Sequence, residues 1–220
     1  MLSLIAAHAG EAITYGIHSP EATIAALDTT IEDTANGIRA RVVDRRDGTA
    51  HTLELQMPGR HNLSNALAAI AGAAATGVSV AEAVRALASF RGLARRFDVI
   101  GTSPSGITVI DDFGHNPEKC RATLRTLKAR SGRVIAFFQP HGYGPLRQMG
   151  HELARTFADE LGPDDITMMC DPVYFGGTVD RSEGSERIIA LIEEHGGRAE
   201  YIATREACGE RIIAFARAGE

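Results

Sequence analysis

The sequence predicts an α/β fold whose carboxyl-terminal part is a parallel sheet flanked by helices. Two observations predict it. Beyond about residue 92, short apolar runs rich in β-branched residues alternate with helical segments, which is typical of parallel strands joined by right-handed crossovers. Before that point, strand and turn signals lead into two helix signals, and a new strand series begins afterwards. We therefore expect two domains, residues 1–92 and 93–220.

The first domain opens with a predicted hairpin. Ile13–Tyr15 is a short apolar run. Ile38–Val43 and Thr52–Met57 alternate roughly in polarity, and Asp47-Gly48 between them is a strong hairpin turn signal. We therefore expect strands up to Pro58.

Two helices are expected after the hairpin. The Ala-rich segment Asn62–Thr76 favours a helix and ends just before a glycine. Ser79 is a plausible N-cap for a second helix running to Phe90, because Glu82 stands three residues later and completes a capping box.

Four strand–helix units are expected in the second domain. The strands are Ile107–Ile110, Val134–Phe138, Ile166–Cys170 and Ala199–Ile202, with helices at about 117–130, up to 161, 183–195 and 204–216. Ligands of parallel sheets gather beyond the carboxyl ends of the strands. The loops Asp111–Pro117, Gln139–Arg147 and Asp171–Val179 follow such ends, so we expect chemistry there.

Composition and charge exclude several classes of protein. A net charge of -5 does not suggest a general nucleic-acid binder, and no apolar run approaches a membrane span. The apolar start, Met1–Ala9, lacks the basic region of a signal peptide. The three cysteines stand far apart, which indicates neither a zinc site nor disulfides and favours a cytoplasmic chain.

Lysine usage excludes one nucleotide-binding motif. A P-loop needs Gly-Lys-Ser/Thr, since its lysine reaches the terminal phosphates. The only lysines here are Lys119 and Lys128, which follow Glu118 and Leu127. This sequence therefore contains no P-loop.

The first candidate binding segment follows Pro58-Gly59. His61, Asn62 and Asn65 lie in the first turns of an expected helix, where Asn62 and Asn65 share a face. Two amides and an imidazole near free backbone N–H groups suit hydrogen bonding to a base edge. The alternative is simple N-capping by Asn62.

A second candidate is the Arg95-Arg96 pair beside Gly92. Paired guanidinium groups suit phosphate or carboxylate, although a solvated basic loop explains them equally well.

The third candidate is the loop after the strand at 107–110. Asp112 can accept from a ribose hydroxyl, and His115 can donate to phosphate or position a substrate. The alternative is a turn and helix cap, with Pro117 at the first helical position. Adjacent Asp111 and Asp112 bring two like charges together, which needs a compensating partner.

The fourth candidate follows the strand at 134–138. Gln139, His141 and Tyr143 offer different hydrogen-bonding groups near one strand end. A purely structural loop is an equal alternative.

Taken in order, the motifs PGRHNLSNALAAI, RRF, DDFGHNP and QPHGY resemble the Mur ligase family, and the alanine-adding members most of all. The similarity runs from about Ile13 to the end. It implies the end of the family's central ATP-binding domain in residues 1–92 and its Rossmann-like carboxyl-terminal domain in residues 93–220.

The resemblance also implies an activity and partners. Members of the family are ATP- and Mg²⁺-dependent amide ligases of peptidoglycan synthesis. They convert a carboxylate to an acyl phosphate, and the amine of an amino acid or peptide then attacks it. The acyl substrate is a UDP-N-acetylmuramate-type nucleotide sugar. The P-loop and most magnesium ligands belong to a region missing from this sequence, so we expect the chain alone to be inactive and to hold no metal ligands of its own.

Residue roles follow from the same resemblance. His61, Asn62 and Asn65 contact the adenine region, Arg96 approaches phosphate or ribose, and Asp112 holds the ribose. The residues His115, His141 and Tyr143 face the incoming amine.

Three departures from the family pattern put that amine in doubt. The loop after Gln-Pro-His usually carries arginines in alanine-adding members, whereas here it holds Gly142, Gly144 and Pro145, and the nearest basic residue is Arg147. Asn116 replaces a second histidine and Phe113 replaces a tyrosine. A non-catalytic nucleotide- or partner-binding module remains the alternative. A nicotinamide-dependent enzyme is excluded, because no strand is followed by Gly-x-Gly-x-x-Gly.

Overall fold

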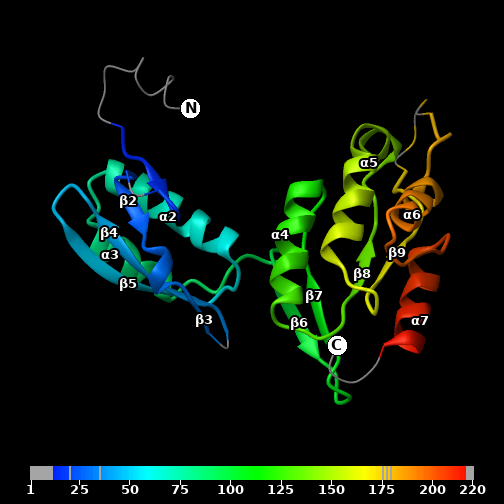
Figure 1. Cartoon of the computed structure of the whole chain (residues 1–220), viewed down its shortest axis with the longest axis horizontal. Helices are drawn as coiled ribbons and strands as arrows, with labels where there is room; N and C mark the ends of the chain where they lie inside the picture. Colours follow the sequence, from blue (N-terminus) through cyan, green and yellow to red (C-terminus); the bar gives the residue numbers. More distant parts are fainter. Residues whose placement is uncertain are drawn as a thin grey trace. The chain divides into compact units, whose positions relative to one another are not determined.

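The computed structural model describes residues 12–19, 21–34, 36–174, 176, 178 and 180–216. The chain divides into two compact units, Met1–Gly92 and Leu93–Glu220 (Figure 1). The apolar start Met1–Ala9 and part of the Asp171–Val179 loop lie outside the described residues.

The first unit contains a five-stranded, mostly antiparallel sheet of order β1-β2-β4-β3, with β5 paired to β4. Its elements are β1 (Tyr15–Gly16), β2 (Ile24–Ala26), the 3-10 helix η1 (Asp28–Thr30), β3 (Glu32–Asp33), β4 (Ile38–Asp44) and β5 (Thr49–Leu55). The hairpin expected around Asp47-Gly48 is confirmed, since β4 and β5 pair in register from Ile38 with Leu55 to Asp44 with Thr49. Buried and exposed side chains alternate along β4, as its sequence pattern requires. The sequence did not indicate β2 or β3.

Two helices pack on this sheet. They are α2 (Arg60–Ala75) and α3 (Val80–Ala88), and the apolar faces of both join the strands in one buried core. The capping box is confirmed: the Ser79 hydroxyl accepts from the Glu82 N–H at 3.3 Å, and the Glu82 carboxylate accepts from the Ser79 N–H at 3.2 Å. The second helix ends two residues before the expected Phe90.

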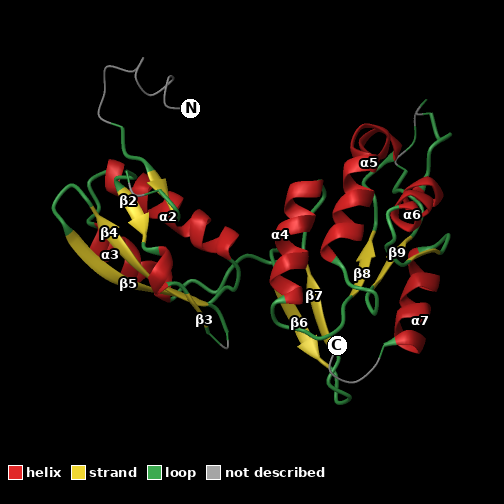
Figure 2. Ribbon diagram, viewed as in Figure 1, coloured by secondary structure: helices red, strands yellow, loops and turns green. Residues whose placement is uncertain are grey.

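The second unit has a parallel sheet of order β10-β9-β8 with helices around it (Figure 2). Its strands are β8 (Ile135–Phe138), β9 (Ile166–Met169) and β10 (Ala199–Tyr201), and its helices are α4 (Pro117–Lys128), α5 (Tyr143–Glu160), α6 (Ser185–Glu194) and α7 (Arg205–Phe215). Residues from α4, α5 and α6 form a buried core with Met169 of the central strand. The α/β class and the parallel sheet flanked by helices are confirmed.

One expected strand does not join that parallel sheet. β7 (Thr108–Asp111) pairs antiparallel with β6 (Asp98–Thr102) in a separate two-stranded sheet. The expectation was wrong here because β6 was overlooked: it is short and exposed, and its register shifts between Val99 and Gly101. A partner only a few residues upstream forms an antiparallel hairpin easily, whereas a parallel pairing needs a long crossover.

No helix in the described part of the chain is long and apolar enough to cross a membrane.

Candidate functional site

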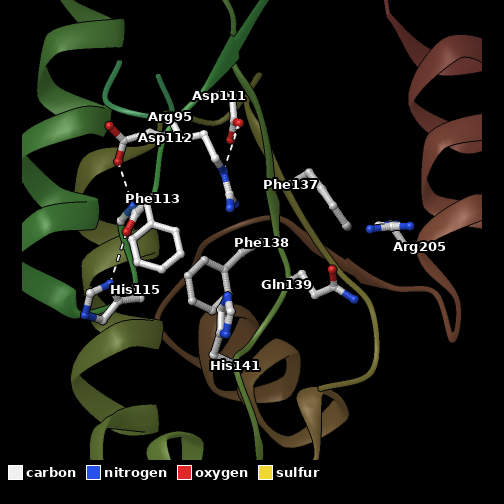
Figure 3. A pocket seen from close by; sticks show the side chains of 11 residues that line it. Arg95, Asp111, Asp112, Phe113, His115, Phe137, Phe138, Gln139, His141 and Arg205 are labelled. Atoms are coloured by element: carbon white, nitrogen blue, oxygen red, sulfur yellow. Dashed lines mark hydrogen bonds and ion pairs between the residues drawn. The ribbon is translucent and has the colours of Figure 1, made fainter. Parts of the chain in front are cut away.

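A polar cavity of about 250 Å³ lies in the second unit, where the loops after β7 and β8 meet (Figure 3). It is lined by Asp111–His115, Phe137–Gln139 and His141, with Arg95 and Arg205. Two loops that the sequence singled out therefore converge on one space, although their strands belong to different sheets.

Asp112 organises the wall of this cavity. One carboxylate oxygen accepts the Phe97 N–H at 2.8 Å, and the other accepts the Gly114 N–H at 2.7 Å. A side chain at Gly114 would place its Cβ only 2.9 Å from the Asp112 carboxylate, so a larger residue there would have to displace that carboxylate. Asp112 thus ties the segment before β6 to the loop after β7, and this tie supports the turn interpretation of the motif.

The two adjacent carboxylates do have compensating partners. Arg95 Nε lies 3.2 Å from an Asp111 carboxylate oxygen, and Asp112 takes its two backbone N–H groups. Both side chains of the Arg95–Asp111 pair are substantially exposed, so we expect this pair to orient the groups more than to stabilise the fold.

Phe113 contacts both cationic and aromatic side chains. The Arg95 guanidinium is 5.0 Å from the centre of its ring, and His115 and His141 meet its edge at 5.3 and 5.6 Å between ring centroids. Cation–π and edge-to-face contacts of this geometry are attractive. The phenylalanine therefore contacts both histidines at the cavity, and we expect it to position them.

The structure brings together three of the five site residues expected in the second unit: Asp112, His115 and His141 all line the cavity. Arg96 does not line it. Its guanidinium lies 5.6 Å from the centre of the Phe113 ring, and Arg95 is the arginine at the wall. Tyr143, the first residue of α5, does not line it either.

Sequence reasoning missed Arg205. It reaches the cavity from the first position of α7, on the opposite side from the two histidines (Figure 3). Arg205 also forms an ion pair, at 3.6 Å, with its exposed neighbour Glu206. The available signal was Thr204, an N-cap directly after a predicted strand, which places the next residue at the carboxyl end of the sheet.

The residue after His115 has a structural role. The Asn116 side chain accepts the Lys119 N–H at 2.9 Å and caps α4, and Pro117 occupies the first helical turn. The asparagine that departs from the family pattern is therefore the N-cap of the helix that follows the loop.

The start of α2 in the first unit carries the other candidate residues. Gly59 is its N-cap, with φ 94° and no side-chain cap. The alternative interpretation, N-capping by Asn62, is wrong: Asn62 lies inside the first turn, and its amide donates to the Pro58 carbonyl at 2.8 Å. Asn65 is exposed on the same helix.

Lys128 is held in an ion pair, and the Cys120 thiol is inert. Lys128 donates at 2.7 Å to Asp165, whose buried carboxylate also accepts the Val134 N–H. Burial, with a smaller contribution from the Asp112 charge, raises the pKa of Cys120 to about 12. The thiol therefore stays protonated and is no nucleophile near neutral pH.

The described residues contain no cluster of three or more His, Cys, Asp and Glu side chains that could hold a metal. Asp111 is paired with Arg95, and Asp112 accepts backbone N–H groups.

A second, smaller cavity of about 110 Å³ adjoins the first. It shares His115, Phe138 and His141 with the polar cavity, and its other walls are apolar side chains and proline rings. They are Pro140, Pro145, Leu146, Met149 and Leu153.

The chain belongs to the Mur ligase family. Residues 95–220 match the sequence profile of the Mur ligase glutamate ligase domain, and residues 1–73 match that of the Mur ligase middle domain. This identification confirms the resemblance indicated by the motifs.

Two curated relatives are UDP-N-acetylmuramate–L-alanine ligases. The protein from Pelotomaculum thermopropionicum is 33% identical over 219 residues, which are 99% of this chain and 46% of the relative. The protein from Agrobacterium fabrum is 37% identical over 215 residues, which are 94% of this chain and 44% of the relative. This chain thus spans less than half the length of these relatives.

Two solved ligase structures have a fold similar to that of this chain. UDP-N-acetylmuramate–alanine ligase from Thermotoga maritima superposes with a TM-score of 0.69 at 25% identity, over 94% of this chain and 42% of that one. A murein peptide ligase from Psychrobacter arcticus gives a TM-score of 0.63 at 25% identity, over 94% of this chain and 41% of that one.

Proposed function

We propose that this chain is part of an ATP-dependent amide ligase of peptidoglycan synthesis. The ligase joins an amino acid or peptide to a UDP-N-acetylmuramate-type substrate in the cytoplasm. Its reaction forms an acyl phosphate from the substrate carboxylate and ATP. The amine then attacks the acyl carbon and phosphate leaves, which gives an amide, ADP and phosphate.

One observation carries this proposal beyond family membership: His115 and His141, from two separate loops, line one polar cavity and flank the same phenylalanine. Fixed imidazole groups can hold an amine and accept its proton as the amide forms. The residues we propose to face the amine are these two histidines. Tyr143 is a weaker candidate, because it lies outside the cavity lining.

Nucleotide contacts are proposed in both units. In the first unit, the start of α2 offers His61, Asn62 and Asn65 for contacts to adenine, next to an N-terminus that no side chain caps. In the second, Asp112 can accept a ribose hydroxyl, because each of its oxygens has a further lone pair. Arg96 or its neighbour Arg95 can approach phosphate.

We further propose that the chain alone is inactive. Phosphoryl transfer depends on positioning and charge neutralisation of the phosphates, which a P-loop and bound Mg²⁺ provide. The sequence has no P-loop, and the described residues offer no magnesium ligand set.

A chimaeric ligase tests the proposal. The part of the Agrobacterium fabrum ligase that has no counterpart here would be joined ahead of this chain. ADP release would then be measured with UDP-N-acetylmuramate and single amino acids. We expect release that depends on both substrates, and none from the isolated chain.

Matched variants keep the test specific. His115→Ala and His141→Ala should each lower the amine-dependent rate by about 100-fold, the scale of a misplaced reacting group. Glu118→Ala, an exposed change on α4, should leave the rate unchanged. A folded chimaera that binds nucleotide but shows no acceptor-dependent ADP release would instead support a non-catalytic binding module.

A further inference from the structure

The apolar cavity beside the histidines has no role in the proposed chemistry so far. It is formed within one stretch of the second unit, between His115 and Leu153. Leu146 and Leu153 are almost fully buried in its walls, and Met149 is half-buried. The space is thus a preformed hollow against the hydrophobic core.

The cavity is larger than one methyl group requires. About 110 Å³ is several times the roughly 10–15 Å³ that one water molecule needs. A single methyl group would leave most of this space empty, whereas an isobutyl or thioether side chain would occupy much of it. Unfilled apolar space forfeits contacts on one side, so a larger apolar group binds better there.

The chemistry of the lining excludes charged side chains. Apart from the two shared histidines, no ionisable residue lines this cavity. The nearest basic residue along the chain, Arg147, is held by Asp180 at 2.7 Å. A carboxylate or ammonium group placed among Pro145, Leu146 and Met149 would be buried without a partner, which is costly.

The position of the cavity links it to the reacting amine. His115 and His141 line both cavities, so a molecule whose amine lies at the histidines can extend its side chain directly into the apolar space. An α-amino acid has this shape, since its amine and its side chain leave the same carbon atom.

We infer that the apolar cavity bounded by Pro145, Leu146, Met149 and Leu153 is the side-chain subsite for the incoming amino acid, and that it selects an uncharged aliphatic side chain larger than that of alanine. This inference rests on the proposed ligase function and specifies its substrate class. Met149, a half-buried residue of α5, is the specificity-determining residue that a substitution can test.

Binding to this 220-residue chain can be followed through its methionine methyl groups. The chain has five methionines, so ¹³C-methyl labelling gives a simple spectrum, and Met149→Leu identifies the Met149 signal. The probes are L-leucine, L-alanine, L-glutamate and L-lysine. Met57, in the first unit, provides an internal reference.

We expect L-leucine to shift the Met149 signal saturably and to bind at least about tenfold more tightly than L-alanine, because each extra methylene in such a pocket contributes discrimination of this order. L-glutamate and L-lysine should not shift it. Met149→Phe fills the space and should abolish the preference for leucine, as followed by the Gly142 amide signal.

Equal binding of alanine and leucine, or no shift with any of the four amino acids, would overturn the inference. The chimaeric ligase separates this failure from failure of the proposed function. Activity with L-alanine alone would leave the ligase assignment intact and refute the subsite. Leucine binding at Met149 without amide formation would retain the subsite and refute the ligase.

Discussion

The start of α2 and the loop after β7 both carry candidate nucleotide residues, yet the fold uses them differently. At α2 the N-cap is a glycine without a side-chain cap, and Asn65 points its exposed amide to solvent. In the loop after β7, both oxygens of Asp112 accept backbone N–H groups. At α2 the Asn65 amide is exposed to a ligand, whereas Asp112 already accepts two backbone N–H groups of its own unit.

This difference separates stability from binding. Where the fold already uses a polar group, substitution lowers the free energy of unfolding before it affects any ligand. Where the group is exposed, substitution leaves the fold nearly unchanged and affects only binding.

Asp112→Ala should destabilise the second unit by about 3 kcal/mol, because two backbone N–H groups lose a charged acceptor. Asp112→Asn keeps one acceptor oxygen and should lower the stability of the second unit by about half as much. Chemical denaturation and hydrogen exchange at the Phe97 and Gly114 amides measure the effect. If the variants unfold like the parent, the loop is not held by this carboxylate.

Phe113→Ala should cost the second unit about 2 kcal/mol, since it removes the ring that Arg95, His115 and His141 contact. Phe113→Tyr retains the ring and should change stability by less than about 0.5 kcal/mol. The NMR line widths of the His115 and His141 rings report the loss of order. Sharp, unshifted histidine signals in Phe113→Ala would show that the phenylalanine does not position them.

Asn62→Ala should lower the stability of the first unit by about 1 kcal/mol, because its amide no longer donates to the Pro58 carbonyl. Asn65→Ala, on the exposed side of the same helix, should stay within about 0.5 kcal/mol of the parent. Thermal unfolding of the two variants provides the comparison. Equal losses would mean that both amides are structural and that α2 offers less to a ligand than we propose.

We expect acid to lower the stability of the first unit through the carboxylate of Asp44. Its hydrogen bonds from Arg46 hold its pKa below the usual value. A carboxylate with a lowered folded pKa stabilises the fold above its unfolded pKa of about 3.9, and this stabilisation is lost as pH falls through the folded pKa. Stability of the first unit measured between pH 5 and 2 should therefore fall, and Asp44→Asn should weaken that fall. An unchanged pH profile in the variant would assign the acid sensitivity to other groups.

Local sequence signals predicted much of the fold. The Asp47-Gly48 turn, the Ser79–Glu82 capping box and Pro117 at the start of α4 depend on residues a few positions apart, so the sequence reveals them directly. β6 escaped notice because it is short, exposed and irregular. Its pairing also removed β7 from the expected parallel sheet.

The candidate site was predicted only in part, because its assembly depends on distant contacts. The loops at Asp112 and His141 were expected to converge as neighbours in one parallel sheet; they do converge, although β7 belongs to a separate sheet. The Phe97 N–H that Asp112 accepts lies fifteen residues earlier in the chain, and no pattern announces it. Arg205 reaches the same cavity from α7, almost a hundred residues beyond Asp112, and only tertiary structure reveals that approach.

The most direct test of the account is calorimetric titration of this chain with ADP and Mg²⁺. We predict binding with a Kd of about 1 mM or weaker, since the polar groups at α2 and at Asp112 come without a phosphate cradle. A Kd in the micromolar range, about 4 kcal/mol tighter, would contradict the account. It would mean that the chain holds a complete nucleotide site and acts as an independent nucleotide-binding module.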